Sequence, residues 1–178
     1  MKIIIASDLH GSAYYAERLI EIFEKEKADK IILLGDVYNH GPRNPFPKEY
    51  SPSRVAEILN GIKSNRLVVK GNCDSPVDKL ISEFDFIEDV CLLHEGKTFL
   101  LTHGHVYNRD NMPSTQFDVI IYGHFHTGFI SKKGKTIVVN TGSLSLPKEN
   151  TPNSYILLEK NTLVLKTIDG TVIKQHKF

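Results

Sequence analysis

Five short segments of the sequence carry side chains that can bind metal ions, and each segment follows a stretch predicted to be a β-strand. The side chains are carboxylates, imidazoles, one amide and one thiol: Asp8, His10, Asp36, Asn72, Cys73, His103, His105, His124 and His126. In α/β sheets, ligands bind at the carboxyl ends of strands, where loops converge. Mixed imidazole, carboxylate and amide ligands suit Mn, Fe, Zn, Co or Ni better than Ca or Mg. These residues therefore predict a transition-metal site beside a sheet.

The spacing within two of these segments leaves room for a pair of ions. Asp8 and His10 lie two positions apart, as do His124 and His126. In an extended backbone, residues i and i+2 point to the same side, roughly 6.5–7 Å apart. Two divalent ions about 3.5–4 Å apart, with ligands at about 2.1 Å, fit between two such pairs. Glycines at positions 35, 71, 104 and 123 permit tight turns and close approach of the backbone beside these residues.

The first half of the chain alternates buried strands with amphipathic helices. Apolar runs predict strands over Lys2–Ser7, Lys30–Leu34 and Arg66–Lys70. Apolar residues at helical spacing predict helices over Ala13–Lys27 and Arg54–Lys63. This alternation of strands and helices implies parallel strands joined by crossover helices.

The second half of the chain is rich in strands, with no internal repeat and no linker. Turns such as Lys133-Gly134 and Asp169-Gly170 are typical of hairpins. The predicted strands are Val90–His94, Thr98–Thr102, Asp118–Tyr122, Gly128–Lys132, Thr136–Asn140, Ser154–Glu159, Thr162–Ile168 and Thr171–Gln175. A parallel start followed by many antiparallel strands predicts one α/β domain over residues 1–178, with two packed sheets and helices outside.

Composition and charge exclude several classes of protein. The 178 residues are 40% apolar and 24% charged, which is ordinary for a globular domain. A formal net charge of +1 gives no basic surface for wrapping nucleic acid and no basic patch for a membrane. The first apolar run, Ile3–Ala6, is too short for a secretory signal or a membrane span. Two cysteines are too few for a disulfide framework, so we expect a soluble cytoplasmic protein.

The metal-capable segments, taken in order, resemble a known signature. The motifs are Asp8-x-His10, Gly35-Asp36, Gly71-Asn72-Cys73-Asp74, His103 and Gly123-His124-x-His126. They resemble those of the calcineurin-like metallophosphoesterase superfamily, from residue 1 to about 145. The loop over residues 35–44 and the Gly-Asn-Cys-Asp variant are similar to its small prokaryotic phosphodiesterases. Each motif alone is common, whereas the ordered set is specific. The resemblance implies a four-layer αββα sandwich, with two packed mixed β-sheets flanked by helices.

The resemblance also implies a site for two divalent metal ions, with Mn²⁺ expected and Fe, Zn, Co or Ni as alternatives. The ligands would be Asp8, His10, Asp36 and His126 for one ion, and Asp36, Asn72, His103 and His124 for the other. Asp36 would bridge both ions. Two divalent ions against two carboxylates leave the site positively charged, and a hydroxide with a singly charged phosphodiester would neutralise it.

The implied reaction is hydrolysis of a small phosphodiester by in-line attack of a hydroxide that bridges the two metals. Asp36, Asn72, Cys73 and His105 are the candidate catalytic residues. Members of the superfamily usually carry histidine at the position of Cys73, where it helps bind phosphate and can protonate the leaving group. A thiol is a much weaker hydrogen-bond donor. Phosphomonoesters are therefore expected to be poorer substrates than activated diesters, and His105 is a candidate to supply part of the missing function.

Several residues near the metal segments have two alternative roles. Asn39, His40 and Arg43 lie in the long loop after the second strand, where they either bind the substrate phosphate or stabilise the loop. Cys73 has an alternative role as a thiolate metal ligand. Asp74 either orients a metal ligand or caps a helix that begins near residue 77.

Two other functions stay open at this stage. One is a binding scaffold with an idle metal site, like the retromer subunit of this fold, although that subunit lacks the histidine that corresponds to His10. The other is a nuclease, as in the DNA-repair branch of the superfamily, which carries additional segments that have no obvious place in this chain.

Cyclic nucleotides, a phospholipid head group or another small diester all fit as substrates, and a homo-oligomer is compatible with the sequence.

Overall fold

The computed structural model of the protein describes residues 1–62 and 65–178, and its strands form two sheets. The strands are β1 (Lys2–Ala6), β2 (Lys30–Leu33), β3 (Arg66–Val69), β4 (Phe86–Ile87), β5 (Val90–His94), β6 (Lys97–Leu101), β7 (Val119–Tyr122), β8 (Phe129–Lys133), β9 (Thr136–Asn140), β10 (Ser154–Glu159), β11 (Thr162–Thr167) and β12 (Val172–Lys177). A seven-stranded sheet has the order β12-β11-β10-β1-β2-β3-β4, and a five-stranded sheet has the order β5-β6-β7-β9-β8. The prediction of two mixed sheets is confirmed.

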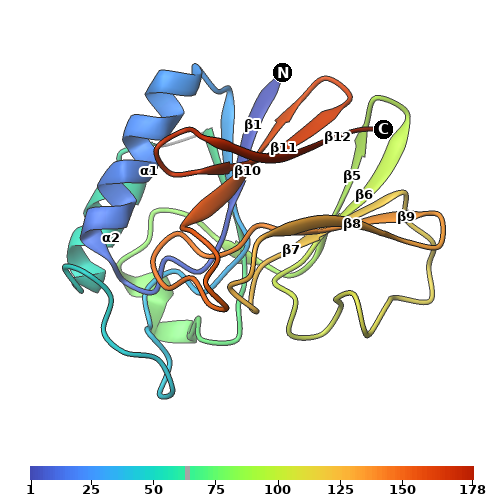
Figure 1. The fold of residues 1–178 in the computed structure, drawn as a ribbon. Helices are drawn as coiled ribbons and strands as arrows, with labels where there is room; N and C mark the ends of the chain where they lie inside the picture. Colours follow the sequence, from blue (N-terminus) through green and yellow to red (C-terminus); the bar gives the residue numbers. More distant parts are fainter. Residues whose placement is uncertain (63–64) are drawn as a thin grey trace.

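Two helices cover the outer face of the seven-stranded sheet, on the side away from the five-stranded sheet (Figure 1). Helix α1 (Ala13–Glu26) connects β1 to β2, and α2 (Pro52–Asn60) lies between β2 and β3. In α1, the buried residues Ala16, Leu19 and Ile22 recur every third position and form one apolar stripe. These crossover helices join β1, β2 and β3, which run parallel as the sequence predicts.

The observed elements begin and end within a few residues of the predicted ones. Helix α2 begins at Pro52, two residues before its predicted start, because the fixed φ of proline suits the first turn of a helix. It ends at Asn60, and Lys63, the predicted last residue, lies outside the described residues. A short 3₁₀ helix, η2 (Pro76–Leu80), stands where a helix is expected near residue 77, and the two-residue strand β4 was not predicted.

The hydrophobic core between the sheets follows the alternation of side chains along each strand. Ile3 and Ile5 of β1 face the second sheet, where they join Phe99 of β6 and Ile121 of β7, whereas Ile4 faces the helices. All five side chains are buried. Burial of each such side chain stabilises the fold by about 1.5–3 kcal/mol. The two core layers therefore hold β1 rigidly in the centre of the molecule.

The five-stranded sheet differs from the prediction in its strand directions. Its three central strands, β6, β7 and β9, run parallel, and β5 and β8 pair with them as antiparallel edges. On its outer face, Tyr107, Met112 and Phe117 pack against the sheet. They belong to residues 104–117, which contain no helix, so the described helices lie on the other sheet.

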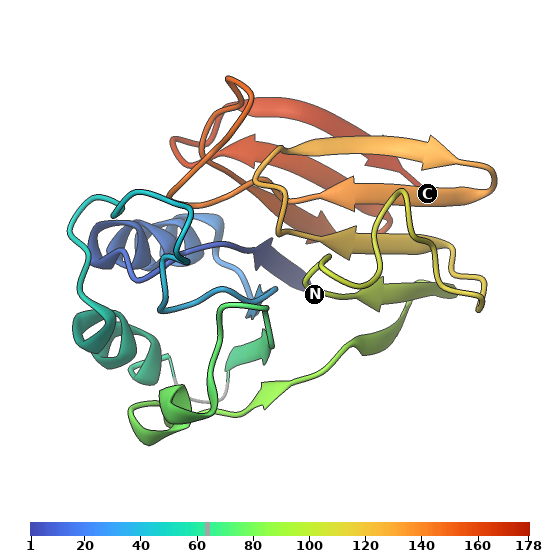
Figure 2. The ribbon, with the colours of Figure 1, turned by 90° about the horizontal axis from the view of Figure 1, so that it is seen from below.

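The two sheets are joined in different ways at their two pairs of edges. Strands β8 and β12 contact each other on one side, while the chain passes directly from β4 to β5 on the other (Figure 2). The parallel strands β1, β2 and β3 of one sheet and β6 and β7 of the other carry the metal-capable segments at their carboxyl ends. Within the described part of the chain, no helix has the length and apolar character needed to cross a membrane.

Candidate metal centre

The loops that follow β1, β2, β3, β6 and β7 bring the predicted ligand side chains together. Nitrogen and oxygen atoms of Asp8, His10 and His126 lie within 4.8 Å of one another, and those of Asp36, His103 and His124 form a second such group. The seventh predicted ligand joins the second group, since its Asn72 Oδ1 atom lies 3.0 Å from His103 Nε2. The two groups match the two ligand sets that the family resemblance implies.

Three of the histidines have one ring nitrogen tied to the backbone. The Nδ1–H groups of His10, His103 and His126 donate to the carbonyls of Asn39, Leu34 and Leu146, at 2.7, 2.6 and 2.6 Å. Because a carbonyl only accepts, the proton sits on Nδ1 and the Nε2 atom faces the site. This arrangement is typical of metal-binding histidines, whose second nitrogen is oriented by a hydrogen bond.

When the rings are neutral, their Nε2 lone pairs face one another and the carboxylates across the site. His10 Nε2 lies 3.1 Å from His126 Nε2, and His126 Nε2 lies 3.3 Å from Asp8 Oδ1. Asp8 Oδ1 is buried and has no hydrogen-bond partner, while Asp8 Oδ2 accepts the His124 N–H at 2.9 Å. Such converging lone pairs repel one another unless a proton or a metal cation lies between them. The residues present therefore fit a metal ion.

Asp36 lies between the two ligand groups. Its Oδ2 atom is 3.4 Å from His103 Nε2 in one group and 3.9 Å from His10 Nε2 in the other. Its Oδ1 atom accepts the Cys73 N–H at 2.8 Å, which orients the carboxylate. This is the position that a carboxylate shared by two ions requires.

The charges of the cluster shift its pKa values in the directions that a cation site predicts. Burial opposes ionisation, yet His10 and His126 hold the pKa of Asp8 far below its usual range. Burial also opposes the charge on His103, but the Asp36 carboxylate raises the pKa of His103 to about 9. Burial and the neighbouring His103 lower the pKa of His124 to about 4. The carboxylates thus favour positive charge at the centre, and a bound metal would replace the protons there.

The backbone geometry at the ligands differs from the predicted extended form. Asp8, His10, Asp36, His124 and His126 all have φ between 52° and 63°, in the left-handed region. Non-glycine residues avoid this region, and such strain clusters at functional sites. The prediction that i and i+2 spacing in extended chain brings these pairs together is therefore wrong. Sharp turns after the strands aim the side chains instead.

A serine-rich segment that the sequence did not single out supports the first of these turns. Ser143 Oγ and Ser145 Oγ both donate to the Asp8 carbonyl oxygen, at 2.7 and 3.0 Å. Ser143 Oγ also accepts the Leu146 N–H at 2.9 Å. Both serines are buried, so water does not compete for these hydrogen bonds. The two bonds therefore hold Asp8 in its left-handed conformation. A small hydroxyl residue has no chemical signature of its own, which is why this role escapes a motif search.

Asp74 joins the loops that follow β2 and β3. Its carboxylate accepts the N–H groups of Asp36, Val37 and Gly71 at 2.8, 2.8 and 2.7 Å. Burial raises the pKa of Asp74 to about 6, and these three N–H donors oppose that rise. The alternative role as a helix cap is wrong, because Asp78 accepts the N–H at the start of η2. A Cβ atom on Gly71 would lie 2.2 Å from Asp36 Oδ1, so this approach requires glycine.

Cys73 lies beside both ligand groups. Its thiol, with His10 and Asp36, forms a third set of atoms within 4.8 Å of one another. Burial and the Asp36 carboxylate raise the pKa of the Cys73 thiol to about 12, which favours the protonated thiol at neutral pH. Asn72 Nδ2 donates to the sulfur at 3.3 Å. The geometry leaves the thiolate-ligand alternative open, while the pKa favours a neutral thiol.

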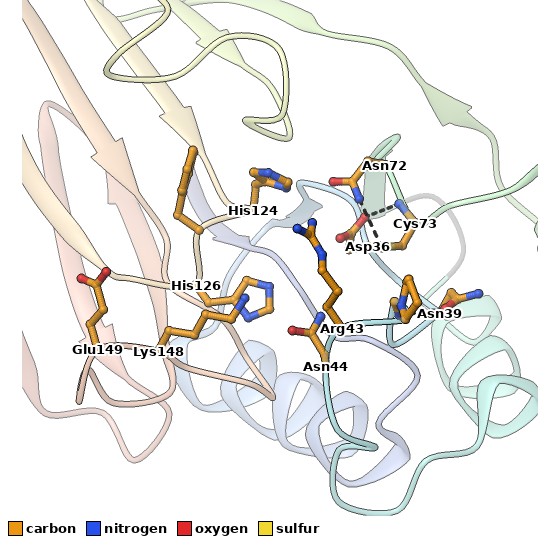
Figure 3. Close-up of a pocket in the computed structure, with 13 residues that line it drawn as sticks. Asp36, Asn39, Arg43, Asn44, Asn72, Cys73, His124, His126, Lys148 and Glu149 are labelled. Atoms are coloured by element: carbon orange, nitrogen blue, oxygen red, sulfur yellow. Dashed lines mark hydrogen bonds between the residues drawn. The ribbon is translucent and has the colours of Figure 1, made fainter.

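A cavity of about 800 Å³ opens over the centre, and two of the four remaining predicted residues line it (Figure 3). Asn39 and Arg43 line it, and the Arg43 guanidinium extends toward Asp36 and His124. His40 does not line this cavity; its ring packs 4.4 Å from the Phe46 ring. The geometry at His40 therefore matches the alternative in which it stabilises the loop.

His105 and several residues absent from the predictions complete this region. His105 is exposed and does not line the cavity, although its ring centroid lies 5.5 Å from that of His103. The cavity walls contain six residues that the sequence reasoning did not assign to the site, namely Gly41, Pro42, Asn44, Phe125, Lys148 and Glu149. Phe125 lies between two predicted ligands, which was an available signal. Lys148 lies in a segment with no recognised motif.

Comparisons with known proteins agree with this architecture. The sequence profile of the calcineurin-like phosphoesterase superfamily domain matches residues 1–163. The chain is 40% identical to phosphodiesterase YfcE of Escherichia coli strain K12 over 178 residues, covering 98% of this chain and 97% of that protein. The solved structure of E. coli Yfce, described as a phosphoesterase, superimposes with a TM-score of 0.95 at 38% identity, covering 99% of both chains. The predicted fold class, two packed mixed β-sheets of this superfamily, is confirmed, with the described helices on the seven-stranded sheet and the 104–117 segment over the other.

A more distant structure shares the fold. Vps29 of Entamoeba histolytica superimposes with a TM-score of 0.70 at 21% identity, covering 100% of this chain and 99% of that one. At this level of identity the likeness concerns the fold alone.

Proposed function

The chain belongs to the calcineurin-like phosphoesterase superfamily and is an enzyme of that superfamily, and on this premise we propose that it hydrolyses a small phosphodiester with two divalent metal ions. The proposal follows the relative of 40% identity, which is named a phosphodiesterase. Mn²⁺ is the proposed metal, because the ligands combine imidazoles, carboxylates and one amide.

One observation carries this proposal: three histidines whose Nδ1–H groups donate to backbone carbonyls direct their Nε2 atoms toward two buried carboxylates. In our proposal, Asp8, His10, Asp36 and His126 would hold one ion, and Asp36, Asn72, His103 and His124 would hold the other. When bound, the ions would lower the pKa of a water nucleophile and stabilise negative charge on the phosphoryl oxygens. Asp36, whose Oδ2 atom lies between the groups, is the proposed shared ligand.

The residues around the ligands have separate proposed tasks. Arg43 extends into the cavity and would donate hydrogen bonds to a phosphoryl oxygen, because a guanidinium presents several donors in a fixed plane. Asn39 lines the same wall. Asp74 keeps the loops of Asp36 and Asn72 at a fixed separation, because its carboxylate accepts three backbone N–H groups from them.

Cys73 is the basis for the proposed preference for diesters. Its thiol lines the cavity next to Asp36, and at neutral pH it is neutral and a weak hydrogen-bond donor. A phosphomonoester brings two negative charges and, when its leaving group is poor, needs a proton donor. Position 73 offers no strong acid to supply that proton. Phosphomonoesters should therefore react weakly or not at all.

The proposal also covers the location of the protein and its partners. We propose a cytoplasmic enzyme whose main partner is its small diester substrate. Free thiols at Cys73 and Cys91 are compatible with a reducing compartment. The near-neutral charge of the chain supports a small substrate over a wrapped nucleic acid. Assembly into a homo-oligomer stays compatible with this proposal.

A reconstitution assay tests the function directly. Metal-stripped protein would be given bis(p-nitrophenyl) phosphate, p-nitrophenyl phosphate or single-stranded DNA, each with and without Mn²⁺. We expect Mn²⁺ to restore hydrolysis of the diester, with much slower turnover of the monoester. Cleavage of DNA as the best substrate would identify a nuclease instead. Absence of turnover with Mn²⁺, Fe²⁺, Zn²⁺, Co²⁺ and Ni²⁺ would favour a binding scaffold.

A further inference from the structure

Lys148 is a second cation in the wall of the cavity, and the proposed hydrolysis does not use it. Lys148 lies between β9 and β10, while Arg43 lies in the loop after β2. Figure 3 shows both side chains extending into the cavity from different loops. Among the described residues, neither cation forms an ion pair. Glu149 follows Lys148 in the chain, but its carboxylate points away from the centre (Figure 3).

The backbone of Lys148 is fixed to a ligand-bearing loop. The Lys148 N–H donates to the His126 carbonyl at 3.1 Å. Thr151 donates to the Lys148 carbonyl through both its N–H and its hydroxyl, at 3.0 and 2.7 Å. Leu146, two residues earlier, accepts the His126 Nδ1–H at 2.6 Å. The segment that orients the His126 imidazole therefore also fixes the backbone of Lys148 beside the reaction centre.

The charge of the cavity exceeds what a simple diester neutralises. Two divalent ions against Asp8 and Asp36 would leave two positive charges, which a hydroxide and a singly charged diester cancel. Arg43 and Lys148 would then remain against one further lining carboxylate, Glu149, which points away from the centre, so positive charge stays in excess beside the reacting phosphate. Cations in a partly enclosed cavity attract a ligand of opposite charge more strongly than cations on an open surface.

We infer that the natural substrate is a phosphodiester whose alcohol component carries its own anionic group, and that Lys148 binds this second group. The inference rests on the proposed phosphodiesterase function and specifies its substrate class. A cavity of about 800 Å³ has room for a ligand of nucleotide size. The ring of Phe125, 46% exposed, adds a flat apolar wall to the same cavity.

A matched pair of diesters tests this specificity. The probes are thymidine 5′-(p-nitrophenyl phosphate) and its 3′-phosphorylated form, and release of p-nitrophenolate is measured with the Mn²⁺-loaded enzyme. We expect kcat/KM to be about three- to tenfold higher for the 3′-phosphorylated probe, as a partly exposed charge-assisted contact provides. Lys148→Met should bring this ratio close to one, and Lys148→Arg should retain most of it. Lys135→Met, on an exposed hairpin away from the cavity, should leave the ratio unchanged.

A binding measurement separates failure of this inference from failure of the proposed function. Calorimetry compares thymidine 3′,5′-bisphosphate with thymidine 5′-phosphate on the full chain, with and without Mn²⁺. Tighter binding of the bisphosphate, lost in Lys148→Met, supports the site even if no diester is hydrolysed. Equal binding and equal kcat/KM for the two probes overturn the inference while leaving diester hydrolysis intact. A preference that persists unchanged in Lys148→Met also overturns it.

Discussion

The histidine rings of the centre are oriented before any ion arrives. Backbone carbonyls of Asn39, Leu34 and Leu146 each accept one Nδ1–H, so the reactive Nε2 atoms of three rings face the same space. Pre-orientation of this kind reduces the conformational freedom that is lost when a ligand binds. At the residue scale, the site is therefore determined by which nitrogen each ring exposes, and a sequence motif does not contain that information.

Asp36→Asn tests the shared ligand. The amide keeps an oxygen for the Cys73 N–H but replaces the anionic Oδ2 that lies between the two groups. We expect kcat/KM for bis(p-nitrophenyl) phosphate to fall by at least about 10³-fold, with weaker binding of both ions. Asp85→Asn, an exposed aspartate on the surface, serves as the matched control and should retain full activity. Near-normal turnover by a folded Asp36→Asn protein would show that the carboxylate is not shared.

Cys73→His tests the proposed origin of the diester preference. An imidazole at this position restores a strong hydrogen-bond donor beside Asp36, where the neutral thiol now lies. We expect the ratio of p-nitrophenyl phosphate to bis(p-nitrophenyl) phosphate turnover to rise about tenfold or more. Cys91→His, at an exposed position of β5, is the control and should leave the ratio unchanged. An unaltered ratio in Cys73→His would remove Cys73 from the explanation.

At the scale of elements, the loop between β9 and β10 supports the metal centre. Ser143 and Ser145 hold the strained Asp8 residue, and Leu146 orients His126.

The order of the motifs in the sequence predicted which strands end in metal ligands, because a ligand residue follows each of these strands directly. The same sequence did not predict this loop, because buried serines act here through hydrogen bonds to a carbonyl that is distant in sequence. It also missed the parallel pairing of β6, β7 and β9, since long crossovers lack turn signatures.

Replacement of both hydroxyls in Ser143→Ala/Ser145→Ala tests this support. The Asp8 carbonyl loses two buried donors and the Leu146 N–H loses its acceptor. We expect the free energy of unfolding to fall by about 2–4 kcal/mol in urea titrations. Mn²⁺ affinity should fall about ten- to a hundredfold, because Asp8 and His126 are no longer fixed. Ser53→Ala, exposed on α2, should change neither quantity, and unchanged Mn²⁺ affinity in the double variant would refute the supporting role.

Glu26 links the end of α1 to the seven-stranded sheet and makes the stability pH-dependent. It accepts hydrogen bonds from Lys166 and Tyr155. Burial alone would raise its pKa, but Lys166 and Tyr155 lower the pKa of Glu26 below its ordinary value of 4.5. A lowered carboxyl pKa stabilises the fold fully above the unfolded value, and this contribution is lost as pH falls through the folded value.

Glu26→Gln should therefore destabilise the protein by about 1–2 kcal/mol at pH 7. The difference from the parent protein should shrink as the pH falls below about 4.5, where the unfolded state takes up the proton, and should vanish below the lowered pKa of the folded state, where Glu26 is protonated in both states. Urea unfolding at several pH values measures this. Glu24→Gln, two residues earlier on α1 and without a described hydrogen-bond partner for its side chain, is the control. A difference that stays constant from pH 7 to pH 3 would contradict the account.

At the scale of the whole molecule, two sheets and their connecting loops act as one frame for the cavity. Ligands come from the ends of β1, β2 and β3 in one sheet and of β6 and β7 in the other. A sequence gives the order of these strands and the residue types at their ends, which is why the fold class and the ligand cluster were predictable. It does not give the direction of a side chain such as Lys148, because that depends on how the 140–150 segment folds back over His126.

Metal loading should stabilise this frame. Five ligand residues have left-handed backbone, and the buried Asp8 and Asp36 carboxylates repel one another without a cation. A ligand that binds only the folded state raises Tm in proportion to RT ln(1 + [L]/Kd). We expect Mn²⁺ at a hundred times its Kd to stabilise the fold by about 2.7 kcal/mol, and Ca²⁺ at the same concentration to do much less. Differential scanning calorimetry after chelation measures this, and an identical Tm with and without Mn²⁺ would contradict it.

Anomalous diffraction from Mn²⁺-loaded crystals tests the central claim most directly. We predict two peaks about 3.5–4 Å apart, with Asp36 between them, the Asp8, His10 and His126 group on one and the Asn72, His103 and His124 group on the other. A single peak, or two peaks that do not share Asp36, would contradict the account.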